Sequence, residues 1–371
     1  MTRIVIEDDA VLRLAGVLLD PATDPERRAA FAAYVRHDCP DFDAWSAQAR
    51  QRFAGIAGAD VVFVRDGAEL LAALPGAEAV ILEDLPFGPD ELASATSLKV
   101  VQRFGTVLRG IDLDACRQRG VTVLSLRRRT NIAVAEHAFA MLMALCKRLH
   151  QISNLVTDER LRAAGFAPGP FDTRHTASAN WGRVAGLRTL HGSRLGLIGF
   201  GEIGREMARL AVGAGMDVGY FQRTRLSAEE EAALGVQFRP WDEILSTSDV
   251  LSVHVPKTVQ NLLDSAAIAR MKPGAFLINV ARAGAVDRTA LLDGLRSGRI
   301  AGAGLDVHYV EPVPPDDEFL ALPSVILTPH LAGGSRMNGL QDMSDMLAGL
   351  ALALRPRTGQ ATPQALDGER Q

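Results

Sequence analysis

One short stretch, Leu195 to Met207, constrains this chain more than any other, because an apolar run leads directly into three closely spaced glycines. The order is LGLI, then Gly199-Phe-Gly201-Glu-Ile-Gly204, then a helix-like pattern. Gly199 lets a strand turn tightly, Gly201 lets the backbone approach a pyrophosphate, and Gly204 lets a helix pack closely on the strand. The stretch therefore predicts a strand, a turn and a helix that bind a dinucleotide.

The sequence after the glycines favours this interpretation over a chance glycine turn. REMARLAVGAG is amphipathic and ends at Gly215, and MDVGYF then reads as a second strand. The cofactor phosphates are expected at the helix N-terminus, where free N–H groups and the helix dipole favour negative charge. Glu202 and Ile203 complete the predicted phosphate-binding loop.

The residues after the second strand bear on the choice of cofactor. NAD sites commonly place an acid there for the ribose hydroxyls, whereas the additional phosphate of NADP calls for a cation. This chain has Gln222, Arg223 and Thr224, followed by Arg225. Gln222 can bond a ribose, and Arg223 with Thr224 can hold a phosphate, so the sequence predicts NAD or NADP with a preference for NADP. The alternative is a solvated turn whose arginines contact nothing.

Length, charge and cysteine spacing limit the class of protein. A chain of 371 residues is too long for one ordinary hydrophobic core, so two domains are expected. A net charge of −4 with both signs interspersed gives no electrostatic footprint for nucleic acid. No apolar stretch reaches the ~18 residues of a membrane span, and MTRIVIEDD is too acidic for a signal peptide. Cys39, Cys116 and Cys146 are too widely spaced for metal-ligand pairs, so we expect no metal and a cytoplasmic protein.

Strand-like and helix-like segments alternate along the chain, which predicts parallel sheets with helices on both faces. Before residue 130 the β-like runs are RIVI, DVVFV, AVIL, KVVQRF and VTVLS. Asn131 to His150 has apolar residues at helical spacing throughout and predicts one long helix. The segment from Leu161 to Thr189 predicts a surface arm or loop. From Leu195 a second series contains DVLSVHVP, AFLINVA, IAGAGLDV and SVILTPH.

Several separate motifs, in order from about residue 98 to 340, resemble the D-isomer-specific 2-hydroxyacid dehydrogenases. They are GFGEIG, HVPKT at His254, MKPGAFLINVARAGAVD at Met271, AGAGLDVHYVEP at Ala301, and LTPHLAGGS at Leu327. The resemblance implies the α/β class, with two Rossmann-like doubly wound parallel-sheet domains, the active site in the cleft between them, and a homodimer.

The resemblance also sets the expected domain boundaries. Residues 1–129 are expected to form a substrate-binding domain, completed by a C-terminal helix within 336–371, and residues 130–335 a dinucleotide-binding domain. The C-terminal helix is predicted from about Met337 to Leu354, followed by a polar tail that begins near Arg355.

By resemblance, the catalytic group is Arg282, Glu311 and His330, and the chemistry needs these residue types. A histidine near its ordinary pKa can take the hydroxyl proton of a 2-hydroxy acid and return it in the reverse reaction. A carboxylate beside one ring nitrogen fixes the tautomer and stabilises the imidazolium, which assigns this role to Glu311. Arg282, at the end of an apolar strand, can grip a carboxylate with two parallel hydrogen bonds and polarise the carbonyl. The alternatives are a surface arginine, a solvated acid and a structural histidine.

Further residues are expected around the cofactor. Asp306 resembles the family residue that holds the nicotinamide carboxamide, and its alternative role is to cap a turn at a strand end. Asn279 is expected to support the Arg282 loop rather than touch substrate. The other residues predicted to contact the cofactor are His254, Val255, Pro256, Ala281 and Gly333, together with Arg282 and His330.

The chain departs from the family pattern in its first half. Gly105, Thr106 and Val107 are the predicted substrate-binding residues, but Val107 replaces a second glycine and Arg109 stands where an acid is usual. A different or bulkier anionic substrate would explain this. Arg127-Arg128-Arg129 either adds positive potential near the site or forms a solvated loop. Ala283 and Gly284 after the catalytic arginine leave the shape of that turn open.

These observations predict an NAD(P)-dependent oxidoreductase that transfers a hydride between nicotinamide and a D-2-hydroxy acid or its 2-keto acid. One alternative is a related dehydrogenase of another small anion, such as phosphite. A formate dehydrogenase is a second example, but formate enzymes of the family carry Gln where Glu311 stands, which argues against formate as the substrate. The other alternative is an NAD(H)-sensing binding protein resembling the C-terminal-binding-protein corepressors. The expected partner is a small anionic substrate.

Overall fold

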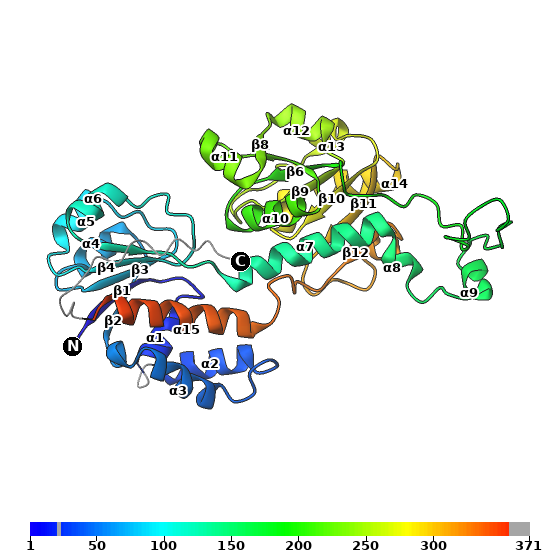
Figure 1. Ribbon diagram of the computed structural model, residues 1–371. Coiled ribbons are helices and arrows are strands. Elements are labelled where there is room, and N and C mark those ends of the chain that lie inside the picture. The colour runs from blue at the N-terminus through cyan, green and yellow to red at the C-terminus, as the bar shows by residue number, and fades with distance from the viewer. Residues whose placement is uncertain (21–23, 356–371) are drawn as a thin grey trace. The chain divides into compact units, whose positions relative to one another are not determined.

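The computed structural model describes residues 1–20 and 24–355, and the chain divides into two compact units (Figure 1). The first unit contains Met1–Arg129 and the C-terminal segment that begins at Ser335, and the second contains Thr130–Gly334. The predicted polar tail and the end of the predicted domain, residues 356–371, lie outside the described residues.

Parallel strands form the centre of the first unit. Within its described residues the sheet has five strands in the order β2-β1-β3-β4-β5, all parallel. Ile4 and Ile6 of β1 face one hydrophobic core and Val5 faces another, so the centre of this strand is apolar on both faces. The strands are those predicted from the sequence: β1 (Arg3–Glu7), β2 (Asp60–Val64), β3 (Ala79–Leu82), β4 (Val100–Arg103) and β5 (Thr122–Leu124).

Helices cover both faces of this sheet. The final helix, α15, packs against α1, α3 and β4 (Figure 1). Its Leu340, Met343, Leu347 and Leu350 enter the same core as Ile4 and Ile6 of β1. These leucines and methionines recur at helical spacing, which is why the helix predicted at 337–354 forms. The helices are α1 (Arg13–Leu19), α2 (Pro25–Val35), α3 (Phe42–Arg52), the short η1 (Ala54–Ile56), α4 (Gly67–Ala73), α5 (Pro89–Ser94), α6 (Leu113–Gln118) and α15 (Arg336–Ala353).

The second unit is also built on a parallel sheet, which has seven strands among the residues described. Their order is β12-β11-β10-β9-β6-β7-β8, so the chain moves outward from β6 in both directions. This doubly wound α/β order confirms the predicted fold class. The strands are β6 (Arg194–Ile198), β7 (Asp217–Phe221), β8 (Val236–Phe238), β9 (Val250–Val253), β10 (Ala275–Asn279), β11 (Ile300–Leu305) and β12 (Val325–Leu327).

The helices of the second unit join these strands. They are α7 (Arg129–Lys147), α8 (Leu149–Ile152), α9 (Asp158–Ala163), α10 (Glu202–Gly213), α11 (Ala228–Leu234), α12 (Trp241–Thr247), α13 (Ser265–Arg270), η2 (Ala283–Ala285), α14 (Arg288–Arg296) and η3 (Glu318–Ala321). Because every paired strand is parallel, the loops after β6, β7, β9, β10, β11 and β12 all leave from one edge of the sheet.

Two predictions about the segment between the sheets need correction. The helix predicted over 131–150 ends at Lys147, because Arg148 adopts a left-handed φ of 54°. Its guanidinium reaches the Ala185 carbonyl (2.8 Å) and Gln151 (2.6 Å), contacts that local helical periodicity does not reveal. The predicted loop from 161 overlaps the end of α9, whose first turn is capped by Thr157. From 164 to 189 no helix or strand forms, as predicted.

Candidate active site at the carboxyl edge of the second sheet

Glycines shape the turn between β6 and α10. Gly199 has a φ of 88°, and a Cβ there would lie 2.3 Å from the His254 carbonyl oxygen. A Cβ at Gly204 would lie 2.8 Å from the Gly199 oxygen, whereas a Cβ at Gly201 would meet nothing within 4 Å. The predicted roles of Gly199 in the turn and of Gly204 in helix–strand packing are therefore confirmed. The backbone beside Gly201 faces open space.

The N-terminus of α10 begins at this turn. Gly201 is its N-cap residue and provides no side-chain acceptor, so the first N–H groups point toward the open space beside Gly201. Glu202 in the first turn accepts a hydrogen bond from Asn131 on α7, and Ile203 packs against the core of the unit. The helix α10 has twelve residues with aligned peptide dipoles, and its first N–H groups are free. Both features hold phosphate at a helix N-terminus.

The two arginines in the segment after β7 differ in their partners. Arg225 is bound at 2.8 Å to both carboxylate oxygens of Glu231, which also accepts from the Tyr220 hydroxyl at 2.7 Å. The hydrogen bond from Arg225 lowers the pKa of Glu231 to about 2, so this pair is ionised at neutral pH. Arg223, by contrast, is exposed and has no hydrogen-bond or ion-pair partner among the described residues. Gln222 donates to the Thr224 carbonyl at 2.7 Å.

The residues after β9 lie beside the glycine turn. The His254 Nε2 is 2.8 Å from the Ser252 hydroxyl, and burial lowers the pKa of His254 to about 4. The ring is therefore neutral near pH 7 and contributes no positive charge beside the turn. Val255 is partly buried and Pro256 is exposed.

The loop after β10 presents the predicted catalytic arginine. Asn279 donates to the Arg282 carbonyl (3.0 Å) and accepts from the Ala281 N–H (3.1 Å), which confirms that Asn279 supports this loop. The Arg282 side chain is exposed at the sheet edge and donates to the Ala281 carbonyl at 2.6 Å. The turn left open by Ala283 and Gly284 is a short 3-10 helix, η2.

Asp306, after β11, is fully buried and holds the loop that follows β12. Its carboxylate accepts from the Thr328 hydroxyl (2.6 Å) and from the N–H groups of Leu331 (2.9 Å) and Ala332 (2.8 Å). Asp306 therefore anchors a segment that is distant in the sequence rather than a turn at its own strand end, and the carboxamide contact stays a prediction. Gly333 follows this anchored segment.

His330 and Glu311 are brought together by two loops of the same edge. The His330 Nδ1 is 2.8 Å from Glu311 Oε2, and both side chains remain partly exposed. This hydrogen bond lowers the pKa of Glu311, so the carboxylate is ionised at neutral pH. His330 has a φ of 52°, a conformation that costs ~1–3 kcal/mol for a residue other than glycine and often marks a functional position.

Two further histidines, His308 and His137, form hydrogen bonds around this pair, and the sequence prediction missed both. The His308 N–H donates to the other Glu311 oxygen at 3.0 Å, and its Nε2 lies 2.8 Å from the Thr328 carbonyl. The His137 Nε2, on α7, lies 2.9 Å from the Thr328 hydroxyl. His308 stands three residues before Glu311, a signal that the sequence offered. His137 has no such signal, because only the folded chain brings α7 to β12.

The predicted substrate loop belongs to the first unit. Gly105 is buried with its carbonyl bonded to the Leu126 N–H at 2.9 Å, while Thr106 is exposed and Val107 partly so. Gly105 has a φ of 156°, so its backbone lies in a region that favours glycine.

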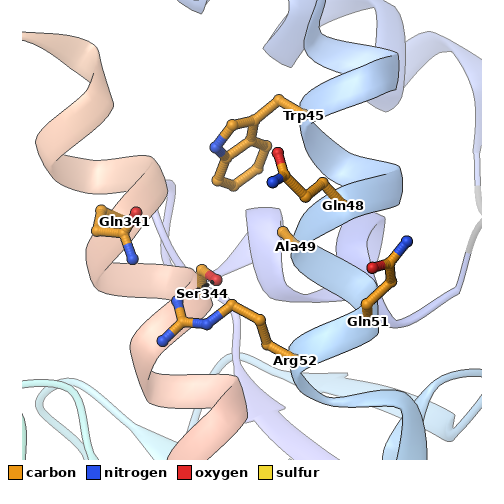
Figure 2. A pocket seen from close by; sticks show the side chains of 7 residues that line it. All are labelled: Trp45, Gln48, Ala49, Gln51, Arg52, Gln341 and Ser344. Atoms are coloured by element: carbon orange, nitrogen blue, oxygen red, sulfur yellow. Dashed lines mark hydrogen bonds between the residues drawn. The ribbon is translucent and has the colours of Figure 1, made fainter.

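A pocket of about 470 Å³ lies elsewhere in the first unit. Figure 2 shows Trp45 and Arg52 from α3 and Gln341 and Ser344 from α15 at its walls. The Arg52 Nη1 donates to the Ser344 hydroxyl at 2.8 Å. None of the predicted catalytic residues lines this pocket, and we assign the candidate site to the sheet edge instead.

Among residues 1–20 and 24–355, no group of three or more His, Cys, Asp or Glu side chains could hold a metal ion. Over the same residues, every helix is too short or too polar to cross a bilayer.

Comparison with known proteins identifies related chains. The family described as "D-isomer specific 2-hydroxyacid dehydrogenase, NAD binding domain" matches residues 139–332. The chain is 37% identical over 244 residues to D-3-phosphoglycerate dehydrogenase of Bacillus subtilis, covering 65% of this chain and 42% of that protein. It is 32% identical over 287 residues to glyoxylate reductase of Korarchaeum cryptofilum, covering 76% and 80%.

A solved structure extends the similarity along the chain. The D-mandelate dehydrogenase of Rhodotorula graminis is 26% identical, with 94% of this chain and 92% of that chain covered and a TM-score of 0.53. The chain spans about half the length of the phosphoglycerate dehydrogenases that it matches.

Proposed function

The chain belongs to the D-isomer-specific 2-hydroxyacid dehydrogenase family, and on that premise we propose that it is an NAD(P)-dependent oxidoreductase. It interconverts a D-2-hydroxy acid and the corresponding 2-keto acid. The observation that carries the proposal is the His330–Glu311 hydrogen bond at the edge of a sheet where the chain also presents Arg282.

The proposed reduction adds one hydride and one proton to the substrate carbonyl. A bound nicotinamide supplies the hydride. Glu311 holds Nδ1 of His330, which leaves Nε2 as the ring nitrogen that donates the proton to the carbonyl oxygen. Glu311 stays ionised and stabilises the imidazolium before transfer. Arg282 orients the substrate carboxylate and polarises the carbonyl through its planar guanidinium.

The residues at the β6–α10 turn fit a dinucleotide. Open space beside Gly201, the uncapped helix N-terminus and the left-handed Gly199 support binding of the pyrophosphate there. Ile203, Val255, Pro256, Ala281, Asp306 and Gly333 are proposed as further cofactor contacts on the same edge.

A preference for NADP is part of the proposal, because Arg223 carries an exposed charge that no described residue neutralises. The variant Gln222→Asp with Arg223→Ala is expected to move the KM ratio toward NADH by at least tenfold, or ~1.4 kcal/mol. Both KM values are measured at one ionic strength, since a phosphate contact is sensitive to salt.

Arg270→Ala serves as the matched control for this experiment, because Arg270 ends α13 just before β10, at the opposite edge of the sheet. Loss of the same charge there should leave the ratio unchanged. A parent enzyme that already prefers NADH, with no change in the double variant, contradicts the proposed role of Arg223.

The substrate is proposed to be a small 2-keto acid, bound in part by the backbone of Gly105, Thr106 and Val107. Two relatives are named for 3-phosphoglycerate and for glyoxylate, so these two chemical classes head the panel. The test measures oxidation of NADH and NADPH by absorbance with glyoxylate, straight-chain 2-keto acids and phosphorylated acids. If no 2-keto acid of the panel is reduced, the proposed function is contradicted.

We further propose a cytoplasmic homodimer. All three cysteines are free and buried, which fits a reducing compartment. The segment from α8 onward extends away from the second sheet (Figure 1) and exposes four large apolar side chains: Leu149, Val156, Trp181 and Leu187. Burial of such a set against a second copy fits a stable interface. Light scattering of the parent and of Val156→Asp tests this, with a monomeric variant expected.

A further inference from the structure

We propose that His308 is a positioning residue for the proton transfer, because it closes a cycle of hydrogen bonds that holds His330 and Glu311 relative to each other. The cycle lies within the second unit and uses both the main chain and the side chain of His308. This inference rests on the proposed function, since His330 acts as the proton donor in that reaction.

Four hydrogen bonds make up the cycle. The His330 Nδ1 lies 2.8 Å from Glu311 Oε2, and the other Glu311 oxygen accepts from the main-chain N–H of His308 at 3.0 Å. The His308 Nε2 lies 2.8 Å from the Thr328 carbonyl oxygen, which also accepts from the main-chain N–H of His330 at 2.9 Å. The path that leaves the His330 imidazole therefore returns to the His330 main chain through His308.

The acceptor beside His308 determines which of its ring nitrogens carries hydrogen. A carbonyl oxygen can only accept, so the Nε2 of His308 donates the hydrogen of this bond. In the neutral imidazole, Nδ1 then carries no hydrogen. Because the Nε2–H is already bonded to the Thr328 carbonyl, it is not available to a substrate. His308 therefore acts through His330 and is not a second proton donor.

The peptide unit that His308 holds leads directly into His330. Its nitrogen belongs to Pro329, which has no N–H, so hydrogen bonds can fix this peptide unit only through the Thr328 carbonyl. Among the residues that the structure describes, that oxygen accepts from His308 and His330. The φ of 52° at His330 is strained for a residue other than glycine and persists only where the surroundings hold it. Loss of the His308 bond is therefore expected to let the His330 backbone relax.

The segment that carries His308 is anchored on its other side by Tyr309. The Tyr309 hydroxyl donates to the Val286 carbonyl at 2.8 Å. The Tyr309 ring stacks on Phe319, with ring centres 6.2 Å apart and planes 11° apart. The main chain at His308 is thus fixed independently of the loop after β12, so this segment provides a firm support for the Thr328 carbonyl.

Asp306 holds the same loop at other points. Its carboxylate accepts from the Thr328 hydroxyl and from the N–H groups of Leu331 and Ala332. These bonds do not involve the Thr328 carbonyl, and they remain when His308 is changed. A variant at His308 is therefore expected to keep the loop folded while the imidazole of the proton donor loses its exact placement.

The first experiment replaces the imidazole of His308. His308→Phe keeps a planar ring and removes the Nε2–H donor, so kcat for keto acid reduction is expected to fall about tenfold or more through displacement of the proton donor. The KM for the keto acid and the Kd of NADH should stay within about twofold of the parent, because neither Arg282 nor the β6–α10 turn is changed. His308→Gln offers an amide N–H to the same carbonyl and should recover kcat to within about threefold of the parent.

Removal of His330 separates positioning from a purely structural role. If His308 acts through His330, His308→Phe should change the low kcat that remains in His330→Ala by less than about twofold. A purely structural role would lower kcat by the same factor in both backgrounds. The measurement compares kcat of the parent, the two single variants and the double variant under one set of conditions.

His150→Phe is the matched control. The His150 Nε2 lies 3.1 Å from the Pro323 carbonyl oxygen, which also accepts from Gln151 at 2.7 Å. The contact is of the same kind as that of His308, but Pro323 precedes β12 whereas Thr328 follows it. The control bond therefore lies at the opposite edge of the sheet, and its loss should leave kcat unchanged.

The hydrogen on the His308 Nε2 can be observed without turnover. A proton–nitrogen correlation spectrum of protein labelled with nitrogen-15 histidine distinguishes the two neutral tautomers of each imidazole. At about pH 8.5, above the ordinary histidine pKa of about 6.5, the signals that disappear in His308→Gln should be those of the Nε2–H form. Signals of the Nδ1–H form would show that Nε2 does not donate to Thr328, which overturns the inference.

The outcomes separate this inference from the proposed function. Full kcat in His308→Phe, or an equal loss of kcat in the His330→Ala background, overturns the positioning role and leaves the proposed function standing. No reduction of any 2-keto acid by the parent overturns both. If His308→Phe does not fold, His308→Met takes its place, because its flexible apolar side chain also lacks an N–H donor.

Discussion

At the scale of single residues, the His330–Glu311 pair gives the sharpest prediction. His330→Ala removes the proposed proton donor and is expected to lower kcat at least ~10²-fold, with little change in the Kd of the reduced cofactor. Steady-state kinetics and a fluorescence titration of NADPH measure the two quantities. His175→Ala is the matched control, because the His175 Nδ1 also lies 2.9 Å from a carboxylate, that of Asp172. This pair belongs to the irregular segment 164–189 and not to a loop that follows a strand. Full turnover of His330→Ala would falsify the assignment.

Glu311 makes a separate prediction about pH. The hydrogen bond to His330 lowers the pKa of Glu311, so this carboxylate keeps its negative charge to a lower pH than an ordinary glutamate does. Glu311→Gln removes this charge at every pH, and the imidazolium loses its stabilising partner. The pH at which reduction falls to half its maximum is therefore expected to move toward acid. A kcat profile between pH 5 and 9 that matches the parent contradicts the role of Glu311.

Arg282 is distinguished from a simple positive charge by its geometry. Arg282→Lys keeps the charge but cannot form two parallel hydrogen bonds with a carboxylate, so kcat/KM for the keto acid is expected to fall by ~1.5–3 kcal/mol. Binding of the reduced cofactor should persist. If the lysine variant equals the parent, the anchor for the substrate lies elsewhere, and Arg109 becomes the next residue to change.

At the scale of elements, the β6–α10 turn separates structural glycines from a ligand-facing one. Gly199→Ala places a Cβ 2.3 Å from the His254 oxygen at a φ of 88°, so it is expected to destabilise the second unit by more than ~1 kcal/mol. Gly201→Ala meets no neighbour, so it should leave the unfolding midpoint unchanged and weaken NADH binding at least tenfold. Urea unfolding and NADH titration measure both variants. Unaltered NADH binding by Gly201→Ala would place the pyrophosphate elsewhere.

The same elements show what the sequence could predict. Strands such as β1 and β10 have apolar central runs because both faces are covered, and such runs stand out in the sequence. The short edge strand β8, Val236–Phe238, was not predicted, since three residues give no periodicity. The break at Arg148 depends on the Ala185 carbonyl, 37 residues away, and local patterns carry no such information.

The candidate site also contains residues that the sequence could predict and residues that it could not. His330, Glu311 and Arg282 stand at strand ends within long motifs, so their approach to one sheet edge could be expected. The burial of Asp306 and the contact between His137 and Thr328 depend on packing between α7, β11 and β12. Outside this site, the ion pair between Glu83 and Arg128 was not predicted either, because 45 residues separate its members and each looks like an ordinary surface charge in the sequence.

At the scale of the whole molecule, two units with separate cores should unfold with separate pH dependences. Burial raises the pKa of Glu83 to about 7, so the folded first unit binds a proton that the unfolded chain has already lost above its ordinary pKa near 4.5. The sign follows: the free energy of unfolding of the first unit falls as pH rises from about 4.5 to about 7. Glu83→Gln should remove a fall on the order of 2 kcal/mol between pH 5 and 8.

Trp45 on α3 reports on the first unit once Trp181 and Trp241 are changed to phenylalanine, because the chain has three tryptophans. Urea unfolding followed by this fluorescence is compared between the parent background and Glu83→Gln at each pH. Glu78→Gln gives a control of opposite sign: Lys99 lowers the pKa of Glu78, so its contribution is present above the ordinary pKa and is lost as pH falls. If Glu83→Gln and its background show the same pH dependence, Glu83 is ionised throughout this range and burial does not raise its pKa.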